Sequence, residues 1–216
     1  PNGQTAIVGT SVTVSGNVNK LVKPGFDFVG WNTASNGSGI SYEAGAQLVL
    51  GENVTLYAQW SPKTAVRISY VTTVGGSVTR VSEFLNPETG VASGSKAIPE
   101  TGYEFLGWFE GDTKVADSLE FVPEKPESGW VTATYTAKFA PKHDVKYEVR
   151  HYTQNLSRDG YELMGTETCN TGVTNETVTA VPREYKGFTL NPSAAGAMPS
   201  GVVTGDGSLV LKLYYD

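Results

Sequence analysis

Few side chains in this sequence are of the kinds that make or break covalent bonds. The single cysteine, Cys169, would need a neighbouring base to act as a nucleophile, and His143 and His151 are the only imidazoles. One cysteine forms neither an internal disulfide nor a multi-cysteine metal site. Because Cys169 lies between Thr168 and Asn170, near an expected strand end, we interpret its thiol as a small apolar filler.

Motifs for catalysis or metal binding do not stand out either. No glycine-rich phosphate loop precedes a helix, and no His-Glu metal motif occurs. The acidic residues are scattered over turns, and their spacing singles out no glycosidase pair. Lys146 and Lys212 lie on expected strand faces that we interpret as solvent-exposed, so we expect no lysine–asparagine crosslink. We therefore expect a chain that is not an enzyme and has no cofactor and no metal site.

Aromatic rings that could stack on a sugar are the second kind of chemistry to consider. Trp31 and Trp108 occupy equivalent points of two repeats, which favours a shared packing role over two copies of one ligand site. A sugar-stacking platform remains the alternative for both. Trp130 has no counterpart in the first repeat and follows Pro126-Glu127-Ser128-Gly129, so we expect it to be an exposed loop residue.

Composition narrows the class of protein. Hydrophobic residues make up 39% of the 216 residues and aromatic residues 11%, which is enough for packed cores, while 25 glycines and 11 prolines indicate strands with frequent turns. A net charge of −6 without any lysine or arginine run argues against nucleic-acid binding. No apolar stretch reaches about 18 residues, so we expect no membrane insertion. Because the chain starts at Pro1 without a methionine, we expect a piece of a longer protein, with targeting signals outside it.

A seven-residue phrase occurs twice and shows that the chain is a repeat array. Gly25-Phe26-Asp27-Phe28-Val29-Gly30-Trp31 returns as Gly102-Tyr103-Glu104-Phe105-Leu106-Gly107-Trp108. Each copy has the pattern Gly, aromatic, acid, Phe, aliphatic, Gly, Trp. Repeat arrays are usually built for reach or surface display rather than for one catalytic pocket.

Strand alternation assigns faces to this phrase. With a period of two, Phe26 and Phe28 lie on one face, and Asp27, Val29 and Trp31 lie on the other. The paired aromatic residues are suited to the core of a small module. Gly30 and Gly107, just before each tryptophan, predict a bulge that re-aims the indole.

Each repeat closes with an alternating strand that ends at a proline. The two closing segments are Val54 to Trp60 and Val131 to Phe139, followed by Ser61-Pro62-Lys63 and Ala140-Pro141-Lys142. Proline cannot donate to a ladder and fixes its own φ, so it ends the strand and stiffens the joint. We therefore predict three modules, residues 1–61, 62–140 and 141–216.

The third module keeps the same plan in a divergent form. Tyr147, Val149 and His151 share one face of a first strand, Gly160-Tyr161 opens a second, and Leu209 to Tyr215 closes the module after a turn at Asp206-Gly207. Gly187-Phe188-Thr189-Leu190 occupies the place of the repeated phrase.

Helix signals are scarce along the whole chain. At most one short helical turn is expected, at Val81 to Leu85, and Ser193 to Met198 is expected to form a loop. The expected fold class is therefore mainly β: three small modules in tandem, little helix, and an elongated array.

These residues resemble known repeats of bacterial surface proteins. The first module resembles the Listeria–Bacteroides repeat, or internalin B-repeat, through Gly25 to Trp31, Gly37 to Gly39, Tyr42, Ala44-Gly45 and Asn53 to Trp60. Gly75-Gly76-Ser77-Val78-Thr79 with Gly102 to Trp108 resembles a divergent member of that group. The third module is similar to the mucin-binding-protein-like repeats of Gram-positive surface proteins, through Val145-Lys146-Tyr147, Gly187-Phe188-Thr189 and Leu209 to Tyr215.

The resemblance implies β-grasp-like modules along a cell-surface protein, attached to the cell wall through regions outside this chain. The first module departs from the pattern, since only Pro1-Asn2-Gly3 remains of its expected first strand, which would leave an unpaired sheet edge. No ligand-binding residue of these families maps onto the chain.

Two hypotheses about function follow. The first is an extended, monomeric spacer; at about 3.3 Å per strand residue, each module would span ~30 Å and the array ~90 Å. The second is an adhesive module that binds a host glycan or surface glycoprotein through the third module or exposed aromatic residues. Strand pairing at a free edge is a third, weaker possibility.

Overall fold

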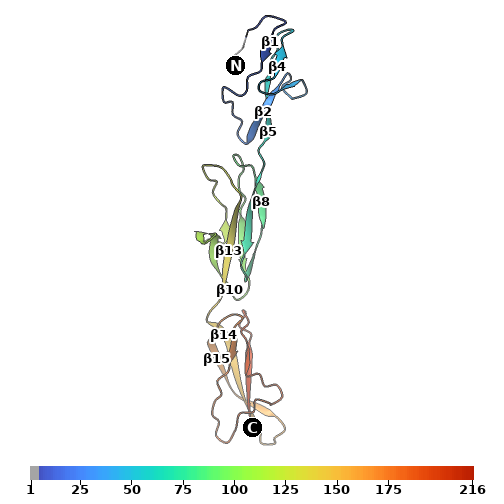
Figure 1. The fold of residues 1–216 in the computed structure, drawn as a ribbon. Coiled ribbons are helices and arrows are strands. Elements are labelled where there is room, and N and C mark those ends of the chain that lie inside the picture. The colour runs from blue at the N-terminus through green and yellow to red at the C-terminus, as the bar shows by residue number, and fades with distance from the viewer. Residues whose placement is uncertain (1–4) are drawn as a thin grey trace. The chain divides into compact units, whose positions relative to one another are not determined.

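The fold is all-β, as expected. A computed structural model describes residues 5–216, and within this range it contains strands and no helix (Figure 1). The segment Pro1-Asn2-Gly3, where we expect a truncated first strand, lies outside the described residues.

The first module forms two small antiparallel sheets. Its strands are β1 (Ser11–Thr13), β2 (Phe26–Asn32), β3 (Ser41–Tyr42), β4 (Gln47–Val49) and β5 (Tyr57–Pro62). β1 pairs with β4, and the other three strands form a sheet in the order β3-β2-β5. Within the described residues β5 is therefore an edge of its sheet.

The second module contains a larger sheet. Its strands are β6 (Val66–Thr72), β7 (Gly76–Val78), β8 (Ser82–Leu85), β9 (Ser95–Pro99), β10 (Tyr103–Glu110), β11 (Thr113–Ala116), β12 (Glu120–Phe121) and β13 (Ala133–Pro141). They form two sheets in the orders β11-β10-β13-β6-β8 and β12-β9-β7. The expected helical turn at Val81 to Leu85 is wrong, because most of this segment is strand β8.

The third module combines antiparallel and parallel pairing. Its strands are β14 (Val145–Gln154), β15 (Tyr161–Gly172), β16 (Thr177–Thr179), β17 (Ser200–Val202) and β18 (Val210–Tyr215). β14 lies between β15, which is antiparallel to it, and β18, which is parallel to it. The predicted faces are confirmed, since Tyr147, Val149 and His151 are buried, as are Leu209, Leu211, Leu213 and Tyr215.

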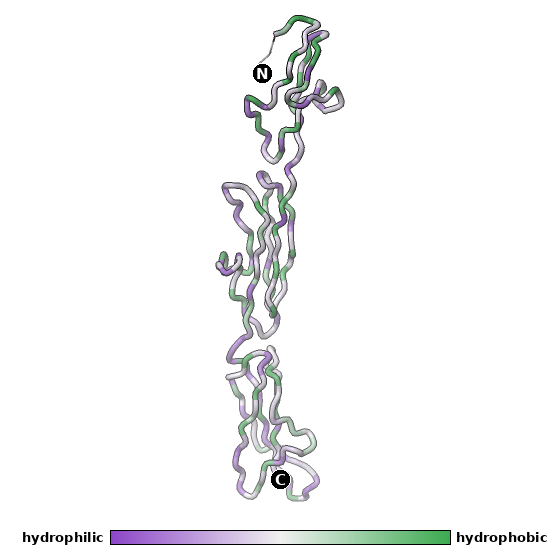
Figure 2. Tube along the Cα trace, viewed as in Figure 1, coloured by the Kyte–Doolittle hydropathy of each residue, from purple (hydrophilic) through white to green (hydrophobic). Residues whose placement is uncertain are grey.

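Grouped by proximity in space, the described residues form two compact units. One comprises residues 5–68, 83–92 and 124–132, and the other comprises residues 69–82, 93–123 and 133–216. Two loops of the second module thus belong to the same unit as the first module. Hydrophobic and hydrophilic residues are interspersed along the strands of both units (Figure 2). In the described chain, no helix has the length and apolar character needed to cross a membrane.

The predicted bulge at the repeated phrase is confirmed in both copies. The register between β2 and β5 shifts between Phe28 and Gly30, and the register between β10 and β13 shifts between Phe105 and Gly107. Each bulge turns the following indole toward the preceding Phe ring, with Phe28 and Trp31 centroids 5.3 Å apart. The strict alternation that placed Trp31 on the face opposite Phe28 is therefore wrong beyond the bulge.

Trp108 is the centre of the second module's core. Its side chain is fully buried, and its ring meets Tyr70 edge-on at 6.0 Å and stacks on Phe121 at 5.4 Å. The predicted packing role is confirmed for this residue. Both closing strands end at their proline, β5 at Pro62 and β13 at Pro141, as predicted.

Candidate functional site

The first glycine of the repeated phrase lies at the centre of a dense set of polar contacts. Gly25 is buried at the end of a tight turn in which Phe26 N–H donates to the Lys23 carbonyl at 3.0 Å. Its φ of 80° is in the region that glycine adopts readily. After the closing strand the chain returns beside it, and Lys63 N–H donates to the Gly25 carbonyl at 2.9 Å.

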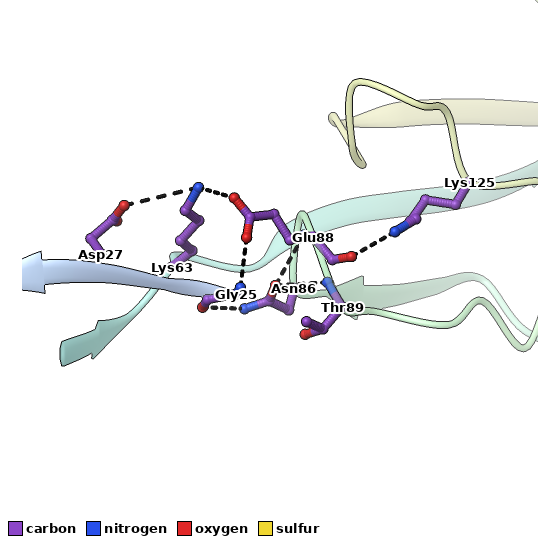
Figure 3. Close-up of polar contacts among 7 residues, drawn as sticks. All are labelled: Gly25, Asp27, Lys63, Asn86, Glu88, Thr89 and Lys125. Carbon is purple, nitrogen blue, oxygen red and sulfur yellow. Dashed lines mark hydrogen bonds and ion pairs between the residues drawn. The ribbon is translucent and has the colours of Figure 1, made fainter. Parts of the chain in front are cut away.

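A loop of the second module contacts both polar groups of the Gly25 backbone (Figure 3). Glu88 Oε2 accepts the Gly25 N–H at 2.7 Å, and Asn86 Nδ2 donates to the Gly25 carbonyl at 2.8 Å. An added Cβ at Gly25 would lie 2.9 Å from Asn86 Oδ1 and from Thr89 Oγ1. We call these contacts, together with Lys63, the Gly25 joint. A side chain at residue 25 would have to displace the ends of the Asn86 and Thr89 side chains and would adopt a positive φ.

Charge reinforces the Gly25 joint. Lys63 Nζ forms a very short ion pair with Glu88 Oε1 and lies 3.9 Å from Asp27 Oδ1. The Gly25 N–H, with the Lys63 ammonium, lowers the pKa of the Glu88 carboxyl below its ordinary value of 4.5. The hydrogen bond to Glu88 in turn raises the pKa of Lys63 above 10.5. Both groups are therefore charged over a wide pH range around neutrality.

Trp130 supports this loop from behind. The residue is buried, its indole Nε1 donates to the Gly90 carbonyl at 2.9 Å, and its backbone N–H donates to the Pro87 carbonyl at 2.8 Å. Lys125 Nζ donates to the Glu88 carbonyl at 2.6 Å. The expectation that Trp130 is exposed is therefore wrong, because its indole packs against the loop that contains Pro87 and Gly90 and hydrogen-bonds to it.

Acid should loosen the Gly25 joint. A carboxyl whose pKa is lowered by folding contributes stability above its ordinary value of 4.5, and this contribution is lost as the pH falls through the lowered pKa. Lys63 has the opposite dependence, and its contribution is lost above pH 10.5. We expect the Gly25 amide resonance to titrate below pH 4.5 in the wild-type chain, and Glu88→Gln to abolish that step.

A matched variant tests whether this titration belongs to the joint. Glu120→Gln removes the exposed Lys96–Glu120 pair, whose N–O distance is 3.1 Å, and should leave the Gly25 titration unchanged. Persistence of the acid step in Glu88→Gln would assign it to a different carboxyl.

The second copy of the phrase forms a similar joint with the third module. Gly102 is buried, has a φ of 87°, and accepts the Lys142 N–H at 2.8 Å, as Gly25 accepts that of Lys63. An added Cβ would lie 2.3 Å from Gly205 Cα and 2.8 Å from Thr174 Oγ1. We call this the Gly102 joint. Its contacts are mainly steric, whereas those of the Gly25 joint are charged.

The polar contacts at the Gly102 joint come from the third-module loop between β15 and β16, which contains Thr174 and Asn175. Asn175 Nδ2 donates to the Tyr103 hydroxyl at 2.7 Å, and Thr174 N–H donates to the Lys142 carbonyl at 3.1 Å. The Thr174 side chain is buried against Gly102, and its hydroxyl has no partner among the described residues.

The nucleophile and base considered from the sequence do not meet. Cys169 is half-buried in β15 and packs against the third module's core, which confirms its role as an apolar filler. His151 is fully buried; its Nδ1 lies 3.0 Å from the Tyr215 hydroxyl and its Nε2 lies 2.9 Å from Glu167 Oε1. Arg183 N–H donates to the same hydroxyl at 2.9 Å. This network satisfies a buried imidazole and gives it no access to solvent.

Aromatic rings in the first and third modules are partly accessible. Half-buried Trp31 lines a pocket of about 450 Å³ with Tyr42, Glu43 and Gln59, while its indole N–H donates to the Ser15 carbonyl at 2.8 Å. In the third module, Tyr152 and Tyr214 stack at 4.9 Å, and Tyr161 meets Tyr214 edge-on at 4.8 Å. We call these three half-buried rings the tyrosine cluster. Among the described residues, no group of three or more His, Cys, Asp or Glu side chains could hold a metal ion.

Comparison with protein families supports part of the sequence interpretation. Residues 1–59 match the Listeria-Bacteroides repeat domain. Residues 66–140 match the divergent InlB B-repeat domain. Each match contains one copy of the repeated phrase, and both families are repeat domains of the kind found in surface proteins.

Two curated relatives come from Evansella cellulosilytica. A "Putative Gly-rich membrane protein" is 32% identical over 142 residues, which cover 65% of this chain and 14% of that protein. A "Putative membrane protein" is 39% identical over 75 residues, which cover 34% of this chain and 11% of that protein. The chain thus spans only a small part of the length of these relatives.

Sequence reasoning did not find the residues of the two joints. Gly25 and Gly102 stand out only as the first residues of the repeated phrase, and neither Asn86 nor Glu88 has a predicted role. The available signal was the recurrence of glycine at the start of both copies of the phrase, because a strand needs no glycine at its start unless the backbone turns or is approached closely.

Proposed function

We propose that this chain is a non-catalytic repeat segment of a bacterial cell-surface protein, acting as an extended spacer. The observation that carries the proposal is the pair of joints. At each copy of the phrase, the first glycine is buried under a loop of the following module, and the post-proline lysine hydrogen-bonds to it. A spacer needs contacts of this kind between consecutive modules, and a flexible linker lacks them.

The remaining parts of the proposal rest on the sequence repeats and on the resemblance to repeats of surface proteins. The chain is divided into modules at residues 61/62 and 140/141, is monomeric, and is attached to the cell wall through regions outside it. The third module is a mucin-binding-protein-like repeat. Its support is the sequence resemblance and the shared use of Gly187 at the position of Gly25 and Gly102.

Small-angle scattering tests the spacer directly. An array of ~90 Å gives a pair-distance distribution with a long tail, whereas three modules folded onto one another give a compact, symmetric distribution. The Gly25→Asp variant serves as the comparison, because its side chain must displace Asn86 and Thr89 and adds a negative charge at the residue whose N–H binds the Glu88 carboxylate. We expect a broader range of dimensions for this variant; a compact wild-type particle would refute the proposal.

The alternative function is adhesion, in which the chain binds a host glycan or glycoprotein. The tyrosine cluster is the specific observation in its favour, since stacked, half-exposed rings in the third module are suitable for a sugar face. A glycan array with the full chain tests it, with Tyr152→Ala to remove the cluster and Tyr42→Ala to alter the Trp31 pocket. Binding that only Tyr152→Ala abolishes supports this function, and no binding by a folded chain removes it.

A further inference from the structure

Three glycines of the chain occupy the same structural position. Each is the third residue of a four-residue turn that is closed by a hydrogen bond of 3.0 Å from the next residue's N–H: Phe26 to the Lys23 carbonyl, Tyr103 to that of Glu100, and Phe188 to that of Tyr185. The φ angles of Gly25, Gly102 and Gly187 are 80°, 87° and 88°. The backbone of the divergent third module thus reproduces this part of the repeated phrase.

The pairing with the closing strand is also equivalent. In the first two modules Pro62 lies opposite Phe26 and Pro141 lies opposite Tyr103, so the following lysine reaches the glycine carbonyl. In the third module Thr189 and Asp216 exchange hydrogen bonds of 2.7 and 2.9 Å. Continued in this register, a residue two positions beyond Asp216 would lie opposite Gly187.

The three glycines differ in what covers them. Gly25 and Gly102 are buried under Asn86 and Thr89, and under Thr174 and Gly205, respectively. Gly187 is exposed, and an added Cβ would meet nothing within 4 Å. The aromatic residue that follows is 38% exposed at Phe188, which leaves an apolar ring beside the open glycine.

We propose that the surface around Gly187 and Phe188 is a docking site for the loop of a further β-module of the same class. The two occupied joints show what kind of partner fits this surface. In each, a tight loop of the next module places a glycine or a short Thr or Asn side chain against the glycine Cα. The Phe188 ring takes the place of Tyr103, which contacts Asn175 at the Gly102 joint. This inference shares the two joints with the proposed function but concerns a surface that neither joint uses.

An extended chain tests the proposal. A second copy of residues 141–216 is appended directly after Asp216, so that its proline and lysine occupy the positions that follow the closing strands of the first two modules. In this arrangement the appended lysine N–H can donate to the Gly187 carbonyl, as Lys142 N–H donates to that of Gly102. We expect its hydrogen exchange to slow by about tenfold, the factor that the net free energy of one hydrogen bond corresponds to, and the Gly187 amide resonance to shift.

A flexible linker provides the reference state. A second extended chain carries about 20 Gly/Ser residues between Asp216 and the appended copy, so that the copy can fold without docking. The proposal requires that the directly joined copy tumble together with the third module and the linked copy tumble separately. If the directly joined copy tumbles as independently as the linked copy and the Gly187 resonance does not shift, then Gly187 is needed only for the backbone conformation of its turn. That result would overturn the proposal.

A substitution separates docking from backbone conformation. Asparagine tolerates positive φ better than other side chains, so Gly187→Asn keeps the turn and fills the docking site. We expect it to change the original chain little and to release the appended module in the directly extended chain. Gly102→Asn in the original chain should release the third module in the same way. If it does not, the fixed joints of the proposed function fail; if only Gly187→Asn has no effect, this inference fails alone.

Discussion

Replacing Trp108 with alanine should lower the free energy of unfolding of the second module by about 3–5 kcal/mol, the range for removing a large aromatic side chain from a core. The indole is fully buried and contacts Tyr70 and Phe121, and its N–H donates to the Leu119 carbonyl at 3.2 Å. The substitution therefore leaves a cavity and removes one of two hydrogen bonds to the Leu119 carbonyl, which still accepts the Ala97 N–H at 2.9 Å. Hydrogen exchange of the β10 and β13 amides measures the loss.

Trp31→Ala is the matched comparison, because this residue occupies the same place in the first copy of the phrase. Its ring is half-buried and lines a pocket open to solvent, so less apolar surface returns to water on unfolding. We expect a loss well below that of Trp108→Ala, measured at the amides of β2 and β5. Equal losses would mean that Trp31 belongs to a closed core like that of Trp108.

These two tryptophans illustrate how far sequence periodicity reaches. The phrase correctly predicted the strand, the aromatic core and the bulge at the second glycine, because all three depend on neighbouring residues. The face predicted for Trp31 by strict alternation was wrong, and the cause is also local. A bulge inserts one residue into the alternation, so every side chain beyond it changes face.

Contacts between segments distant in sequence could not be predicted in this way. Trp130 looked exposed because Pro126 to Gly129 has the composition of a surface loop, and its indole partner, Gly90, is 40 residues away. Val81 to Leu85 looked like a helical turn, but β8 is part of the larger second-module sheet. Tertiary context overrode local preference in both cases.

The first glycine of the phrase shows the same limit. Its recurrence signalled a backbone requirement, and the turn accounts for the positive φ. The burial of Gly25 and Gly102 adds a second requirement, since an added Cβ would lie 2.9 Å from the ends of the Asn86 and Thr89 side chains at Gly25 and 2.3 Å from the Gly205 backbone at Gly102. A sequence alone cannot separate these two requirements, because glycine satisfies both.

Gly102→Ala separates them experimentally. Alanine at this position must adopt a φ of 87°, which is unfavourable for a residue with a Cβ and costs about 1–2 kcal/mol. It would also lie 2.3 Å from Gly205 Cα, a backbone atom that cannot move away as a flexible side chain can. Overpacking of this kind typically costs a further 1–3 kcal/mol. We expect a total loss of about 2–5 kcal/mol at the Gly102 joint, with increased hydrogen exchange at Lys142 and Thr174.

Gly187→Ala is the control, because its φ of 88° is nearly identical and no atom lies within 4 Å of the added Cβ. This variant should show only the conformational cost, about 1–2 kcal/mol, measured by urea unfolding of the third module. The difference between the two variants is then the steric contribution of the joint. If the two losses are equal, the third module moves away from Gly102 at no cost, and the contact between Gly102 and Gly205 does not hold the modules together.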